Sequence, residues 1–224
     1  MSENWLLVET SGRVGKIGLA IDGAVRSAEL DAARRNARDL TATVETLLKE
    51  TSLGVRDLTG VIVARGPGSY TGLRVGLVSA KALAYAVGCE LRAVDTFAAI
   101  AEQAPAEASN LWVIADALQG QVYVQRFTRA GGLWQVADEL RIDAVADWLP
   151  WCASGTWVSG PGVKVYDDRV PHDCPRVPEA DREARLESVF AVGARQAALA
   201  REELFRLEPL YLRGSSAEEK AKRA

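Results

Sequence analysis

A glycine-rich stretch at residues 65–76 is the part of the sequence whose residue types and spacing could do chemistry. It reads RGPGSYTGLRVG and leads from a buried-strand pattern into a helical pattern at 70–87. Glycines permit positive φ and close backbone approach, and free N–H groups at a helix N-terminus attract anions. The sequence contains no GxxxxGK[ST] pattern, so the stretch is not a P-loop. It predicts either an anion or nucleotide contact at Gly68, Ser69 and Thr71, or a tight structural turn.

Two acidic residues at predicted strand ends are the other candidates for chemistry. Glu9 follows a strand pattern at 6–8, and Asp116 follows one at 112–115. Such acids could hold Mg²⁺ beside a phosphate, or they could cap turns and face solvent. The single histidine, His172, lies in a proline-flanked segment. One histidine excludes metal sites built on two and disfavours a Ser-His-Asp triad. The leading interpretation of the chain predicts neither a metal site nor a cofactor, and Mg²⁺ at the two acids belongs to the alternative.

The helix predicted at 70–87 carries small residues at every fourth position, which are Gly72, Gly76, Ala80, Ala84 and the following Gly88. Each glycine inside a helix costs about 1 kcal/mol relative to alanine. Close approach of another element should offset this cost. That element is either the chain's own sheet or a helix of another protein. The apolar stripe of a second helix, predicted at 37–50, could extend the face toward a four-helix interface.

The composition limits the class of protein. The chain has 224 residues, of which 48% are hydrophobic and 25% charged, and its net charge is −3. These values are ordinary for a globular protein of one to two domains, and the acidic balance argues against a chain that binds nucleic acid by itself. The three widely spaced cysteines predict reduced thiols. Neither a secretion signal nor a membrane span is predicted, so the expected location is the cytoplasm.

The order of strand and helix patterns is similar in the two halves of the chain. Each half has three strands, then a helix, a strand and a helix, which predicts antiparallel strands followed by βα crossovers. We expect an α/β fold of two βββαβα subdomains, with mixed sheets flanked by helices, at residues 1–103 and 110–213. An alanine-rich helix is predicted at 182–203, and a flexible tail at 214–224.

At residues 65–76 the sequence resembles the TsaB (YeaZ) family, the dimerisation subunit of the bacterial machinery that makes threonylcarbamoyladenosine in tRNA. The family has a GPGS[FY]TG[LV]R-type turn and helix start, which stands here as GPGSYTGLR at 66–74. Weaker similarities lie in Glu-Thr-Ser at 9–11, in DALQGQVY at 116–123 and in PLYLR at 209–213. The resemblance therefore extends over most of the chain.

The sequence departs from the family's pattern at three places. Glu9 stands where aspartate is usual, Leu118 stands where arginine is usual, and NARDL at 36–40 stands where the family has HSExL. These departures concern helix-cap and acid contacts that the family pattern would otherwise supply.

The resemblance implies an actin/sugar-kinase/heat-shock-ATPase-like fold and a subunit without catalytic activity of its own. A TsaD-like paralogue would carry the metal and the transfer of threonylcarbamoyl to an adenosine beside the anticodon. The chain would form a heterodimer with this paralogue, and a TsaE-like ATPase would join the larger complex. The chain alone would form a homodimer, and it would meet tRNA only through the complex.

The leading hypothesis is therefore an interaction subunit that docks through the helices at 37–50 and 70–87. The expected contact residues are Leu40, Val44, Leu47, Tyr70, Leu73, Arg74, Gly76, Leu77 and Ala80. A bulky residue at Gly76 or Ala80 should then prevent pairing and leave the monomer folded. The alternative is a small phosphotransferase or nucleotidase of the same superfamily, which would use the turn for phosphate and the strand-end acids for Mg²⁺. Nucleotide hydrolysis that is lost on Asp116→Ala would favour the alternative.

Overall fold

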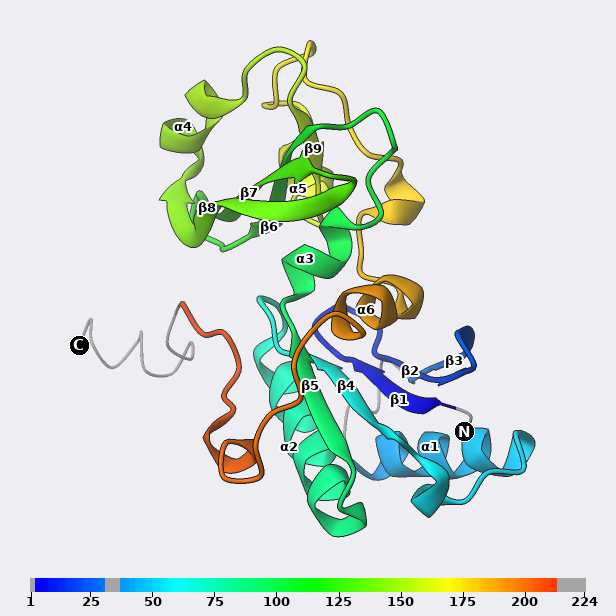
Figure 1. The fold of residues 1–224 in the computed structure, drawn as a ribbon. Helices are drawn as coiled ribbons and strands as arrows, with labels where there is room; N and C mark the ends of the chain where they lie inside the picture. The colour runs from blue at the N-terminus through cyan, green and yellow to red at the C-terminus, as the bar shows by residue number, and fades with distance from the viewer. Residues whose placement is uncertain (1–2, 31–36, 213–224) are drawn as a thin grey trace, which may run out of the picture. The chain divides into compact units, whose positions relative to one another are not determined.

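A computed structural model gives the fold of residues 3–30 and 37–212 (Figure 1). The tail expected at 214–224 and the departure at Asn36 lie outside these described residues, so the expectations for them stay predictions. Among the described residues, every helix is too short or too polar to cross a membrane.

The chain folds into two compact units. The first contains the residues up to Thr96 together with those from Val189 onward, and the second is Phe97–Ser188. The boundaries fall at the start of helix α3 (Thr96–Ala101) and inside helix α6 (Leu186–Gly193). Each unit has a sheet and a hydrophobic core of its own.

A five-stranded mixed sheet forms the first unit. Its strands are β1 (Asn4–Glu9), β2 (Lys16–Ile21), β3 (Ala24–Glu29), β4 (Gly60–Ala64) and β5 (Glu90–Val94), in the order β3-β2-β1-β4-β5. The first three are antiparallel, whereas β4 and β5 run parallel to β1. β1 and β4 are buried along their whole length, as expected for central strands. Because these two strands are parallel neighbours, the loops that follow them meet at one edge of the sheet.

Helices α1 (Ala37–Glu50) and α2 (Tyr70–Val87) lie along one face of this sheet (Figure 1). Both helices have the bounds that the sequence predicted. α2 begins at a Ser69 N-cap and ends at Gly88, whose φ of 77° is in the left-handed region that favours glycine. The apolar stripe of α1, formed by Leu40, Val44, Leu47 and Leu48, is buried against the sheet and α2.

A four-stranded sheet forms the second unit. Its strands are β6 (Asn110–Asp116), β7 (Gln121–Ala130), β8 (Leu133–Ala144) and β9 (Trp157–Ser159), in the order β8-β7-β6-β9. The short helices α4 (Val145–Trp148) and α5 (Val163–Tyr166) complete its core. Inside that core, the rings of Trp112 and Trp148 meet edge to face with centroids 6.4 Å apart. Short 3-10 helices lie at Val55–Asp57, Leu149–Trp151, Glu179–Asp181 and Leu204–Arg206.

Both units repeat one topology, which confirms the predicted fold class. Each begins with three antiparallel strands and continues with a helix, a strand parallel to the first strand, and a second helix. The repeat extends to detail, because β4 and β9 are each followed by Gly-Pro-Gly, at 66–68 and 160–162. The first glycine of each triplet has positive φ, 113° at Gly66 and 97° at Gly160.

The helix predicted at 182–203 is wrong in its extent, because α6 ends at Gly193. A Cβ at this glycine would overlap the Ile62 side chain, so α6 packs closely on β4. Arg92 Nη1 also donates to the Gly193 and Ala194 carbonyl oxygens, at 3.4 and 3.1 Å, which satisfies the helix end.

The segment after α6 packs against the sheet and core of the first unit. Leu199 N donates to the carbonyl oxygen of Leu91 in β5 (2.9 Å), and Leu204 and Leu207 enter the first unit's core. The second compact unit therefore ends earlier than the subdomain expected at 110–213. The physical reason is that the apolar residues of this segment are buried beside α2 and β5, which the sequence pattern did not indicate.

Candidate functional site

The glycine-rich turn lies between β4 and α2, where its polar groups bind residues of the chain itself. Ser69 Oγ accepts a hydrogen bond from Gly72 N (3.3 Å), so Ser69 is the N-cap of α2. Ser69 N donates to the Ser11 carbonyl oxygen at 2.8 Å, and Leu73 N donates to the Ser69 carbonyl oxygen at 2.8 Å. Thr71 is exposed in the first turn of α2 and does not cap it. The turn is thus fastened to the loop that follows β1.

The glycines of the turn and of α2 allow this close contact. A Cβ at Gly68 would overlap Ser11, and one at Gly72 would overlap the Thr10 carbonyl oxygen. A Cβ at Gly76 would overlap Thr10 Oγ1. The small residues Gly72, Gly76, Ala80 and Ala84 form one side of α2, here called the bare edge. The glycines of this bare edge lie against the end of β1. The element that offsets the cost of these glycines is the chain's own sheet, which corrects the expectation that a partner covers this edge.

Most of the expected contact residues lie in the core beneath the two helices. The buried ones are Leu40, Val44, Leu47, Leu73, Gly76, Leu77 and Ala80, and the six with side chains beyond glycine are each at most 4% exposed. Side chains this deeply buried cannot contact a partner protein unless they line a groove at the surface. A bulky residue at Gly76 or Ala80 would disturb the folded monomer, so such a substitution cannot test docking alone.

The surface that α1 and α2 do present is an apolar groove between them. Its volume is about 770 Å³, and Leu40 and Val44 form part of its lining. The most exposed large apolar side chain in it is Val78, at 61%. The remaining lining residues are Ala37, Thr41, Glu45, Leu48, Val55, Arg56, Ser79, Ala82, Leu83, Ala86 and Val87.

Val78, Ala82 and Ala86 of α2 form an outer row that lines this groove. The sequence analysis did not predict this row as a contact surface, although its spacing indicates a common face of the helix. Val78, Ala82 and Ala86 recur at every fourth position, as the bare edge does, but two residues later than its members. Two residues correspond to about 200° around a helix, so this row faces away from the sheet. Apolar residues on the outward side of an amphipathic helix are typical of a contact surface.

Tyr70 and Arg74, expected at the docking face, meet the C-terminal segment of the first unit. The Tyr70 and Tyr211 rings stack with centroids 4.8 Å apart, and the Arg74 guanidinium lies 4.2 Å from the Tyr70 centroid. Arg74 Nε donates to Tyr211 Oη (3.1 Å), while burial raises the pKa of Tyr211. The cluster joins the GPGSYTGLR and PLYLR stretches, because Leu210 N also donates to the Arg65 carbonyl oxygen at 2.8 Å.

Glu9 is buried at the end of β1, where its carboxylate holds the following turn. It is 1% exposed, and Glu9 Oε1 accepts hydrogen bonds from the backbone N (2.8 Å) and the hydroxyl of Ser11. Because Ser11 is also the residue that contacts Gly68 and Ser69, Glu9 organises the loop that supports the glycine-rich turn.

Asp116 has a comparable place at the end of β6 in the second unit. Asp116 Oδ1 accepts from Tyr166 Oη (2.6 Å) and from Leu118 N (2.9 Å). Leu118 and Gln119 both have positive φ, 63° and 55°, which is a strained conformation for residues other than glycine. The carboxylate therefore anchors a strained turn. Within residues 3–30 and 37–212, no group of three His, Cys, Asp or Glu side chains is placed to hold a metal ion.

We expect Tyr166→Phe to reduce the loss of stability that occurs as the pH rises from 10 toward 12. Burial, followed by the hydrogen bond to Asp116, raises the pKa of Tyr166 from 10.0 to about 12. The neutral phenol is thus favoured in the folded state, and the stability it contributes is present below pH 10 and lost as the pH rises toward 12. Urea unfolding across this range measures the effect. An equal loss of stability in the wild type and the variant over this range would contradict the prediction.

The sequence model of the family described as "TsaD: tRNA N6-adenosine threonylcarbamoyltransferase" matches residues 30–202. This chain belongs to that family. It is 32% identical over 147 residues to the tRNA threonylcarbamoyladenosine biosynthesis protein TsaB of Bacillus subtilis, which covers 64% of this chain and 63% of that protein. The TsaB protein of Escherichia coli is 26% identical over 170 residues, with 73% of each chain covered. The aligned part thus spans less than two thirds of the Bacillus protein.

Solved structures show the same fold. YeaZ from Pseudomonas aeruginosa superposes with a TM-score of 0.77 and 24% identity, covering 94% of this chain and 100% of that one. A second solved structure, described as an uncharacterized protein with similarity to peptidase YEAZ from Pseudomonas aeruginosa, gives a TM-score of 0.79 at the same identity and coverage. The resemblance to the TsaB (YeaZ) family is confirmed, and the two mixed sheets form the actin-like fold that it implied.

Proposed function

We propose that this chain is a non-catalytic subunit of the complex that forms N6-threonylcarbamoyladenosine in tRNA. It docks on a TsaD-like catalytic paralogue in the cytoplasm and meets tRNA only through that complex. A TsaE-like ATPase joins the larger assembly, and the chain alone pairs with a second copy of itself. The names of the TsaB relatives support the pathway, and the matching transferase family supports the kinship with the catalytic paralogue.

The apolar groove between α1 and α2 is the observation that carries the proposal. Two of its lining residues are exposed apolar side chains, Val78 at 61% and Val55 at 39%. Two adjacent helices with an apolar outer groove can be completed by two helices of another chain, as in a four-helix bundle. A paralogue of the same fold would present such a pair of helices. The docking face is therefore the outer row of Val78, Ala82 and Ala86, not the bare edge beneath it.

The packing of the glycine-rich turn supports a role without catalysis. The close approaches at Gly68 and Gly72 are filled by Ser11 and Thr10, and Ser69 N is bonded to a carbonyl oxygen of the chain. A phosphate held by this turn would have to displace those backbone contacts. The phosphotransferase alternative therefore has less support from the geometry than docking has.

Substituting Ala82 by glutamate tests the docking face directly. Ala82 lines the groove and is exposed, so the monomer should fold normally, but a carboxylate would be buried unpaired in the complex. We expect binding to the TsaD-like paralogue to weaken about 100-fold or more. Ala42→Glu is the matched control, because Ala42 is an exposed alanine of α1 that does not line the groove.

Co-purification and mass measurement of the complex provide the readout. Wild type and Ala42→Glu should give the heterodimer, and Ala82→Glu should give separate chains. Equal pairing of both variants would remove the groove as the docking face. Nucleotide hydrolysis by the isolated chain that disappears in Asp116→Asn would separately overturn the non-catalytic assignment.

A further inference from the structure

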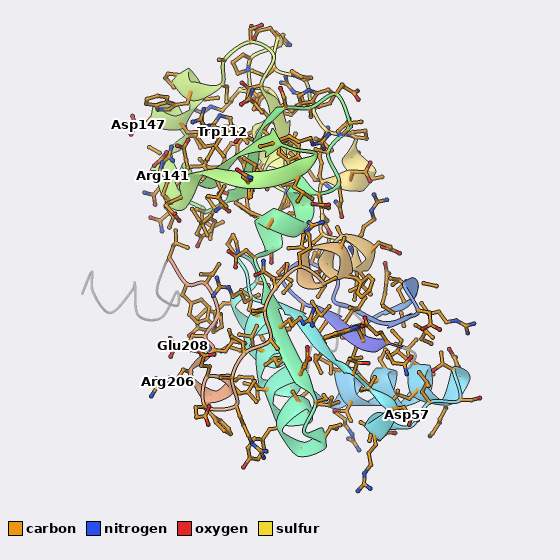
Figure 2. The ribbon with its side chains drawn as sticks, viewed as in Figure 1. Asp57, Trp112, Arg141, Asp147, Arg206 and Glu208 are labelled. Atoms are coloured by element: carbon orange, nitrogen blue, oxygen red, sulfur yellow. The ribbon has the colours of Figure 1, made fainter. Side chains whose placement is uncertain are left out.

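The second unit contains a cavity that the docking function does not use. It lies between the β7–β8 side of the sheet and the segment from α4 to the 3-10 helix at Leu149–Trp151, with a volume of about 510 Å³. Figure 2 shows Trp112, Arg141 and Asp147 together beside β8 and α4. The full lining is Trp112, Arg126, Asp138, Arg141, Asp143, Asp147 and Trp151. Its size is that of a site for a small molecule.

Two arginines on neighbouring strands form the sheet side of this cavity. Their guanidinium carbons lie 5.9 Å (Arg126) and 5.5 Å (Arg141) from the Trp112 ring centroid. Each uses only Nε for its carboxylate, Arg126 with Asp138 and Arg141 with Asp143, both at 2.8 Å. The terminal nitrogens of both arginines make no hydrogen bond with any residue that the structure describes. They remain available for a carboxylate.

The opposite side of the cavity offers an acceptor and an aromatic surface. Asp147 on α4 is exposed, and it has no ion-pair or hydrogen-bond partner among the described residues. Trp151 is 65% exposed, although its backbone is fixed because Trp112 Nε1 donates to the Trp151 carbonyl oxygen at 3.3 Å. A large exposed indole beside an unpaired carboxylate is a suitable surface for an ammonium group on an apolar or aromatic body.

We propose that this cavity binds a small zwitterion with an apolar or aromatic body, such as an α-amino acid with a large side chain. The ligand carboxylate would bind the terminal nitrogens of Arg126 and Arg141, the ammonium would bind Asp147, and the side chain would lie against Trp151. Each of the two neutral ion pairs leaves arginine donors free, and Asp147 adds one unpaired negative charge.

Charge complementarity selects this ligand class over the alternatives. A ligand that is only anionic would leave Asp147 unpaired, and one that is only cationic would leave the free arginine donors unused. A nucleic-acid strand is also disfavoured, because the whole chain carries a net charge of −3. A molecule that carries both charges pairs with both kinds of group. This site is independent of the proposed docking function.

Three related probes separate the two charged contacts. They are L-phenylalanine, which has both charges, L-phenylalanine amide, which has only the ammonium, and N-acetyl-L-phenylalanine, which has only the carboxylate. Titration calorimetry with the full chain should show binding of L-phenylalanine at millimolar concentrations. The amide and the N-acetyl compound should each bind roughly tenfold more weakly or worse, because each lacks one charged contact. Failure of L-phenylalanine to bind, or equal binding of all three probes, would overturn the proposal.

Single substitutions assign each contact to a side chain. Arg141→Gln should weaken L-phenylalanine and N-acetyl-L-phenylalanine but not the amide, whereas Asp147→Asn should weaken L-phenylalanine and the amide but not the N-acetyl compound. Trp151→Ala should weaken all three. The matched controls are Arg169→Gln, Asp168→Asn and Phe205→Ala, which change exposed residues outside the cavity. Asp147 and Trp151 are exposed, so their variants should stay folded, and unchanged binding in both would contradict the assignment.

Discussion

Gly72→Ala should destabilise the protein by about 3 kcal/mol or more, enough to unfold a marginally stable chain. The added Cβ would overlap the Thr10 carbonyl oxygen, which belongs to the backbone and cannot rotate away. Either α2 must lift from the sheet or the loop after β1 must move, and both changes break the Ser69–Ser11 contact. Urea unfolding, followed by circular dichroism, measures the loss. Ala82→Leu on the exposed side of α2 is the control and should leave stability almost unchanged.

Gly76→Ala tests the same contact in a second way, because its added Cβ would overlap a side chain and not the backbone. The new methyl group would overlap Thr10 Oγ1, a buried hydroxyl without a hydrogen-bond partner in the described structure. Thr10→Ala should therefore restore much of the stability of Gly76→Ala, whereas it should not rescue Gly72→Ala. Both glycine variants could instead keep full stability and lose only their pairing with a partner. In that case the bare edge would serve the partner and not the sheet.

The helices that frame the site were predictable because their signals are local. Ser69 at the start of α2, Gly88 at its end and the apolar spacing within α1 are all read from neighbouring residues. The alternation of strands and helices likewise predicted two related subdomains. Each of these features depends on contacts within a few residues, or on a period that the sequence displays directly.

The identity of the neighbour that covers α2 could not be predicted in the same way. A row of small residues on a helix indicates that another element packs closely against it. A sheet of the same chain and a helix of another protein fit such a row equally well. The answer depends on Thr10 and Ser11, which lie about sixty residues before Gly72 in the chain and reach it only through the parallel pairing of β1 with β4. The sequence therefore predicted a close contact correctly and assigned it to the wrong element.

The cavity of the second unit could not be predicted from the sequence either, because strand register brings its lining residues together. Arg126 opposes Trp112 on one side and Asp138 on the other. Irregularities in the β7–β8 pairing lie on both sides of Arg126, between Val124 and Arg126 and between Arg126 and Phe127. Such irregularities re-aim side chains and have no reliable sequence signal. A count of charged residues gives no indication of which of them face each other.

Arg176→Met should lower the free energy of unfolding of the second unit by about 3 kcal/mol or more. The Arg176 guanidinium, with its side chain 18% exposed, pairs with Asp167 through Nε at 2.9 Å. Its terminal nitrogens donate to four carbonyl oxygens, those of Asp167, Val170, Pro171 and Cys174. Methionine keeps an apolar stem of similar length but donates nothing, so the carbonyl oxygens of the buried residues Val170 and Cys174 would lose this donor. Arg169→Met is the matched control, because Arg169 is exposed.

Hydrogen exchange locates the effect of Arg176→Met as well as its size. Val158 N donates to the Pro175 carbonyl oxygen (2.9 Å), and Val177 N donates to the Val158 carbonyl oxygen (3.0 Å), so the segment that Arg176 organises borders β9. Amides of this segment and of β9 should therefore exchange faster in the variant, while those of β1 and β4 in the first unit keep their protection. Uniform loss of protection in both units would mean that they unfold as one. Unchanged protection at β9 would mean that the four carbonyl contacts contribute little to holding the second unit together.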